Sequence, residues 1–195
     1  MSPEKLGSLI GAGFGLVFVL VNSGSLPTTV AVAVRVLAVA AFLVVLVAVR
    51  RPTPAGGSDT PTGGFGRPYW LVVAGEVLLI WVGLALLNAP LDTPDAAVAW
   101  ISCVVGAHFL ALAVVWRNRL FHWLGGAMLA CGLVGLVLAA RGADVGAIKL
   151  VSGILPGAIL LGFALWGSRT RTGPQDAPAG PRQSPLPAQH PRVER

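Results

Sequence analysis

The chain alternates between long apolar runs and short polar breaks. Six of the runs approach the length of about 20 residues that a helix needs to cross the hydrocarbon of a bilayer. They cover approximately residues 6–22, 28–49, 69–87, 96–116, 120–140 and 145–166. The pattern predicts an all-α fold, an integral membrane bundle of six transmembrane helices that occupies residues 1–167.

Composition supports the membrane class over a large soluble core. The chain is 55% hydrophobic and 11% charged, whereas soluble domains carry about 25% charged residues. Mean hydropathy is +0.78. The net charge of +6 comes without a basic stripe interleaved with aromatic residues, so no nucleic-acid partner is predicted. The lipid bilayer is the first expected partner.

The first apolar run could be a helix or a signal peptide, because Lys5 precedes a short hydrophobic stretch. No A-x-A cleavage site follows it. Small residues four apart let helix backbones approach closely in lipid, and Gly7, Gly11 and Gly15 have this spacing. Gly153 and Gly157 repeat the spacing in the last run. We expect a retained first helix that packs through its glycines, with a cleaved signal peptide as the alternative.

Basic residues predict the orientation of the bundle. If the N-terminus is cytoplasmic, eleven of the fourteen Lys and Arg residues fall in cytoplasmic segments, and the outer loops hold only Arg141. This asymmetry is the positive-inside pattern. Aromatic residues at the same ends agree with it, since Trp and Tyr favour the interface. We therefore predict that both termini are cytoplasmic and that the protein resides in the cell membrane, which in a bacterium is the cytoplasmic membrane.

Two segments are predicted to lie outside the bundle. The loop at 50–68 is rich in Pro, Gly and Thr and contains no G-K-[ST], so it is not a P-loop. The tail at 168–195 is rich in Pro and Arg and almost free of apolar residues, a composition typical of disorder. Arg169 and Arg171 begin the tail close to the membrane. They are expected to favour anionic lipid headgroups at the cytoplasmic face.

Four acidic or basic side chains lie well inside the predicted spans: Arg35, Glu76, His108 and Lys149. A charge near the middle of a bilayer costs about 2.5–3.5 kcal/mol on insertion scales, so such residues are candidates for function. Arg35 and Lys149 lie in the outer half of their spans. We expect them to reach the interface or to pair with acidic residues of the outer loops, which are Asp92, Asp95 and Asp144.

Glu76 and His108 form the candidate intramembrane site. They lie seven and eight residues from the same end of consecutive antiparallel spans, hence roughly 10–12 Å deep, and we expect them to touch. Burial disfavours the charged form of each group, whereas a partner of opposite charge favours it. The pair could therefore relay protons. It could equally fasten two helices, a contact worth about 0.6 kcal/mol on average.

The sixth run contains Pro156 followed by Gly157. A proline inside a helix removes one backbone hydrogen bond and produces a kink. The kink could serve packing, act as a hinge, or free a carbonyl that lines a small site. Cys103 and Cys131 are expected to be small packing residues, since two thiols alone do not form a structural zinc site. No metal or cofactor is predicted.

No catalytic motif stands out: the chain has no H-E-x-x-H and no G-x-S-x-G. We therefore predict a non-enzymatic membrane protein that acts as an interaction or accessory subunit, as a homo-oligomer or with a membrane partner. The alternative is a small transporter or proton-coupled carrier built around Glu76, His108 and the Pro156 kink. Such a carrier could contain an inverted repeat of three plus three helices.

Overall fold

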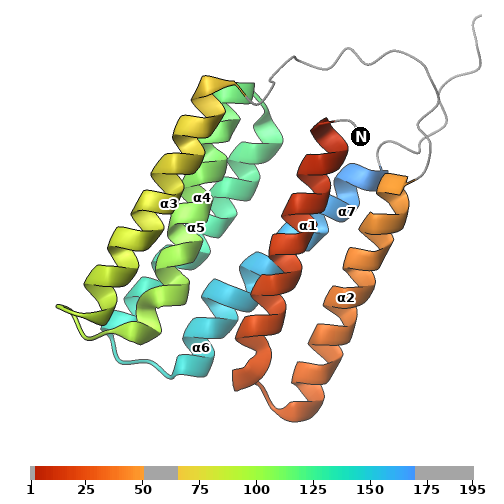
Figure 1. Cartoon of the computed structure of the whole chain (residues 1–195). Helices are drawn as coiled ribbons and strands as arrows, with labels where there is room; N and C mark the ends of the chain where they lie inside the picture. The colour runs from red at the N-terminus through yellow and green to blue at the C-terminus, as the bar shows by residue number, and fades with distance from the viewer. Residues whose placement is uncertain (1–2, 51–65, 170–195) are drawn as a thin grey trace, which may run out of the picture.

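The computed structural model describes residues 3–50 and 66–169. These two ranges contain helices and no strand, and six of the helices are long and apolar enough to cross a membrane. The first five are α1 (Pro3–Asn22), α2 (Thr28–Arg50), α3 (Arg67–Asn88), α4 (Ala97–Trp116) and α5 (Arg119–Ala140) (Figure 1). The prediction of six apolar helices is confirmed. The segment 51–65 and the Pro- and Arg-rich tail from residue 170 lie outside the described residues.

The sixth span changes its helical geometry part of the way along. It begins as α6 (Val145–Lys149), continues as a π-helix, η3 (Leu150–Ile154), and ends as α7 (Leu155–Arg169). A π turn closes its hydrogen bond between residues i and i+5, so it contains one residue more than an α turn. It ends just before Pro156, which is fully buried. The irregularity predicted at this proline therefore takes the form of a wide turn on its N-terminal side.

Short turns join most of the helices and make chain neighbours antiparallel. Arg117 ends α4 in the left-handed conformation with φ 50°. The side chain of Asn118 then caps α5 by accepting a hydrogen bond of 3.0 Å from the Leu120 amide. At the other end of the bundle, short 3₁₀ turns, η1 (Ser23–Ser25) and η2 (Pro94–Ala96), precede α2 and α4.

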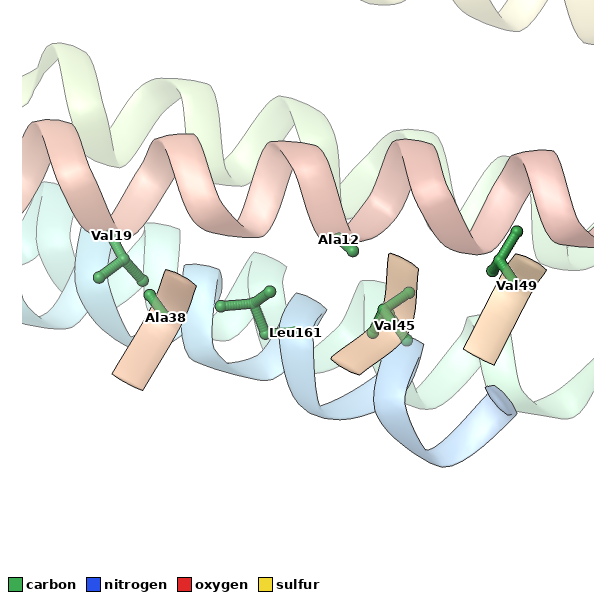
Figure 2. Packing of buried hydrophobic residues seen from close by; sticks show 7 residues of the cluster. Ala12, Val19, Ala38, Val45, Val49 and Leu161 are labelled. Atoms are coloured by element: carbon green, nitrogen blue, oxygen red, sulfur yellow. The ribbon is translucent and has the colours of Figure 1, made fainter. Parts of the chain in front are cut away.

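The helices form two groups of three, which the sixth span joins. Figure 1 shows α3, α4 and α5 side by side in one group and α1, α2 and α7 in the other. One hydrophobic cluster lies among α1, α2 and α7 and includes Ala12, Val45 and Leu161 (Figure 2). A second cluster lies among α4, α5 and α7 and includes Met128 and Leu160. Because α7 contributes to both clusters, it is the element that holds the groups together.

Glycines allow the closest approaches between helix backbones. A Cβ added to Gly125 would lie 2.7 Å from the carbonyl oxygen of Gly106, where α5 meets α4. A Cβ added to Gly15 would lie 2.8 Å from the carbonyl oxygen of Gly157, where α1 meets α7. Real Cβ atoms do not approach a backbone so closely, so these two crossings depend on the absence of a side chain.

The glycine ridge expected on the first helix contacts a neighbour only at Gly15. Gly7 and Gly11 have no atom within 4 Å of an added Cβ. The buried line of α1 passes instead through Ala12, Gly15 and Val19. Steps of three and four residues keep this line on one face, whereas a strict four-residue step turns about 40° further each time. The ridge therefore leaves the packed face before it reaches the start of the helix.

Candidate functional site

The structure brings Glu76 and His108 together. The carboxylate oxygen Oε2 lies 2.9 Å from ring atom Nδ1, with 20% of the Glu76 side chain and 12% of the His108 side chain exposed. The direction of the contact is poor for a straight hydrogen bond from Nδ1. Opposite charges meet at this contact only when the ring is protonated.

The pair is the middle member of a row of three contacts between α3 and α4. Toward one end of the row, the rings of Tyr69 and Trp116 stack with centroids 6.1 Å apart and an interplanar angle of 11°. Toward the other, the indole N–H of Trp100 donates to the Leu79 carbonyl at 3.0 Å, and its ring fills the space beside Gly83. We call this row the α3–α4 seam; its members are Tyr69, Glu76, Gly83, Trp100, His108 and Trp116.

The members of the seam recur about every two turns of each helix. On α3 they are seven residues apart, and on α4 they are eight apart. Two helical turns take about 7.2 residues, so the α3 members stay on one face, whereas each eight-residue step turns the α4 members by about 80° around their helix. At each of the three contacts a ring of α4 lies against one residue of α3. The Glu76–His108 pair is the one of these three contacts in which the α3 residue is a carboxylic acid.

Aromatic rings extend from the pair toward the turn between α4 and α5. His108 meets Phe109 edge-on at 5.6 Å, Phe109 lies 5.9 Å from Phe121, and Phe121 meets Trp116 edge-on at 5.3 Å. The pair thus contacts the ring of Phe109, and rings fill the neighbouring contacts of the seam on either side of it. Its remaining exposure is lateral, toward the flank of the bundle, because α3 packs chiefly on α4.

A second polar cluster lies at the π-helix, and its two serines were not among the residues chosen from the sequence. Ser102 and Ser152 are both fully buried. The Ser102 hydroxyl donates to the Ser152 carbonyl, and the Ser152 hydroxyl donates to the Cys131 carbonyl at 3.1 Å. Pro156 has no N–H, so the carbonyl four residues earlier, that of Ser152, lacks its α-helical donor. The freed carbonyl that the sequence allowed is therefore satisfied by a hydroxyl from α4.

The serine cluster is tightly packed. A Cβ added to Gly135 on α5 would overlap the Ser152 hydroxyl, and one added to Gly153 would overlap the side chain of Asn22 on α1. Asn22 itself donates to the Phe18 carbonyl at 2.8 Å. The cluster thus joins four spans through hydrogen bonds and small residues. Pro156 and Gly157, the candidate hinge, are buried, and Gly157 lies against α1.

Arg35 finds a partner different from the expected ones. Its Nε donates to the buried Ser23 hydroxyl at 2.7 Å, and no carboxylate of the described residues lies within 4 Å of it. Asp144, an expected partner, caps α6 by accepting from the amides of Gly146 and Ala147 at 2.8 and 3.3 Å. Lys149 is the last residue of α6, is half-buried, and likewise has no acidic partner in the described chain.

The remaining candidates carry no reactive arrangement. Cys103 is buried, Cys131 is half-buried, and both thiols are free. Within the described residues, no group of three or more His, Cys, Asp or Glu side chains could hold a metal ion. Comparison with protein-family models, with curated proteins and with solved structures finds no match to this chain.

Proposed function

We propose that this protein is a non-enzymatic, multi-pass integral membrane protein that acts as an interaction or accessory subunit. The six apolar helices support the membrane placement. One end of the bundle, where α1 begins and α7 ends, is the basic end. It carries most of the basic residues of the described chain, namely Lys5, Arg50, Arg67, Arg117 and Arg119. By the positive-inside pattern this end faces the cytoplasm of the cell, and both termini with it.

The observation that carries the proposal is the lateral exposure of the Glu76–His108 pair. A polar pair on a flank that faces hydrocarbon is poorly solvated, and polar groups in membranes normally face protein or water. The ring contacts on either side of the pair speak against an aqueous path along the seam. A neighbouring membrane helix that covers the flank and offers a hydrogen-bonding group would satisfy the pair. The partner is therefore a second copy or another membrane protein.

Crosslinking in living cells tests this proposal. A photoreactive amino acid replaces Val77, which is 56% exposed and follows Glu76 on α3. The matched control carries it at Val134, an equally apolar, exposed residue on α5. The proposal expects one crosslinked product of defined mass from position 77 and none from 134. It also expects that product to fade when Glu76→Gln is added. Products of equal yield at both positions, or a product indifferent to Glu76→Gln, would contradict it.

Cysteine labelling tests the proposed orientation of the bundle in the membrane. Single cysteines replace Gly24 and Asn118 in a chain whose native Cys103 and Cys131 are serine, and an impermeant maleimide is applied to intact cells. Labelling at position 24 and protection at position 118 are expected. The reverse pattern would overturn the proposed topology.

A proton-coupled carrier is the second candidate, and the contact between Glu76 and His108 is the observation that favours it. Purified protein in liposomes with an internal pH-sensitive dye would report proton flux under an imposed gradient. Flux that depends on both Glu76 and His108 would make the pair a relay and displace the interaction proposal. Flux equal to that of empty liposomes would rule out the carrier function.

A further inference from the structure

The outward face of α2 carries a shallow depression with an arginine at one end. It has a volume of about 370 Å³, is open along its length, and is lined by Arg35, Val36, Val39, Ala40 and Leu43. These residues lie on the side of α2 away from α1 and α7, which pack against Ala38, Val45 and Val49. Ala40 forms the floor, because its side chain is smaller than those of the residues around it.

The length and lining of this groove fit a hydrocarbon chain. α2 rises about 33 Å from Thr28 to Arg50, and the stretch of about 12 Å from Arg35 to Leu43 lies in its middle, so the groove runs from the outer leaflet to about the middle of a bilayer whose hydrocarbon is about 30 Å thick. Apart from Arg35, every lining side chain is aliphatic. A lipid tail that lies along α2 would therefore be in van der Waals contact with the groove over its terminal half.

The Arg35 guanidinium provides the positive charge that would bind the lipid headgroup. The bond from Arg35 Nε to the Ser23 hydroxyl holds the group beside η1, the turn at the end of the bundle. Its terminal nitrogens lie near Gly24. No carboxylate of the described residues neutralises this charge. A fixed guanidinium with free N–H groups binds the oxygens of a phosphate in a planar, two-bond geometry.

We propose that the α2 groove is a binding site for an anionic phospholipid of the leaflet opposite the basic end, with its phosphate on Arg35 and one acyl chain along Val36, Val39, Ala40 and Leu43. The site lies on the other group of helices from the Glu76–His108 pair. It rests on the proposed membrane placement and not on the proposed partner.

Native mass spectrometry of the full chain, released from detergent, tests the site. The lipids added are phosphatidylglycerol and phosphatidylcholine with identical acyl chains. The wild-type chain should retain phosphatidylglycerol in preference to phosphatidylcholine. Arg35→Gln should weaken that retention by about tenfold or more. Ala40→Leu, which keeps the charge and fills the floor, should weaken it as well. Arg141→Gln, an exposed arginine at the same end of the bundle, is the matched control and should have no effect.

Three outcomes would overturn the site: equal retention of the two lipids by the wild-type chain, an Arg35→Gln variant that binds like wild type, or an Ala40→Leu variant that does so. Circular dichroism of each variant checks that the helices are intact, and Arg35→Lys gives a second route if Arg35→Gln does not fold. Alkaline carbonate extraction of membranes separates the two proposals. If the chain is extracted, the membrane placement fails; if it stays and shows no lipid preference, only the lipid site fails.

Discussion

The hydroxyl of Ser102 on α4 donates to the carbonyl of Ser152, the group that Pro156 leaves without a helical partner. A backbone acceptor left free in one span is thus satisfied by a side-chain donor from another. In a membrane such a carbonyl has no water from which to accept a hydrogen bond, so loss of the Ser102 donor would leave it unsatisfied.

Replacing this donor should destabilise the bundle. Ser102→Ala is expected to cost about 1 kcal/mol, a typical value for a hydrogen bond of this kind. Denaturation of the purified protein by SDS in mixed micelles, followed by circular dichroism, measures the loss. Ser25→Ala is the control, because Ser25 is exposed and bonds only to its own turn. In a Pro156→Ala background, where an N–H is restored, Ser102→Ala should cost less; equal costs would show that the two residues act independently.

The α3–α4 seam should depend on the missing side chain at Gly83. A Cβ there would overlap the Trp100 indole, so Gly83→Ala must displace either the ring or α3. Overpacking of this kind costs about 1–3 kcal/mol. Gly75→Ala on the same helix meets no atom within 4 Å and should leave stability unchanged or slightly raised. The melting temperature in detergent compares the two variants, and equal melting temperatures would refute the packing argument.

Glu76 and His108 should be energetically coupled. Glu76→Gln and His108→Gln are each expected to cost about 1 kcal/mol in SDS denaturation. The double variant should cost less than the sum of the two, since each single change leaves the other group without its partner. His122→Gln, a change to an exposed ring at the start of α5, serves as the reference. Strict additivity would mean that the 2.9 Å contact contributes nothing to stability.

The crossing of α1 and α7 gives a fourth prediction. Gly15→Ala places a methyl group against the Gly157 carbonyl and should lower the melting temperature, at a cost of about 1–3 kcal/mol. Gly11→Ala, one helical turn earlier, meets no atom of the described residues within 4 Å and should be neutral for the isolated bundle. If Gly11→Ala instead breaks up an oligomer in gel filtration while leaving the melting temperature unchanged, then the free part of the ridge is the contact between copies.

The six helices were predictable because hydropathy alone determines them. The meeting of Glu76 and His108 was also predictable, since two ionisable residues at equal depth on consecutive antiparallel helices have few other polar partners within reach. The serine cluster was not. Serine is common in apolar helices, and nothing in the chain says which neighbour it faces. Pro156 did signal that the Ser152 carbonyl would need a donor, but it could not indicate that the donor is Ser102, fifty residues away.

Arg35 shows the same limit for charged residues. The outer loops offered three acids, and the sequence left two outcomes for Arg35, which were reaching the interface or pairing with one of these acids. The structure assigns Asp144 to a helix cap and gives Arg35 a neutral hydroxyl instead. Local hydrogen bonding at a helix start competes with long-range charge pairing. Which of the two prevails depends on loop geometry that a hydropathy pattern does not contain.

The π-helix also fixes the rotational phase of everything that follows it. Each residue turns a helix by about 100°, so the extra residue accommodated between Leu150 and Ile154 decides which side of α7 meets which group of helices. Deleting one residue there would give a regular α-helix of almost the same length. The shortened helix would keep Gly157 against the backbone of α1 and the leucines at 160 and 161 in their clusters, because the π turn absorbs the extra residue. If all the residues present wound as a regular α-helix instead, Pro156 would take the place of Gly157 and both leucines would turn away from their clusters. Such a chain would keep six apolar spans and lose the fit between its two groups of helices.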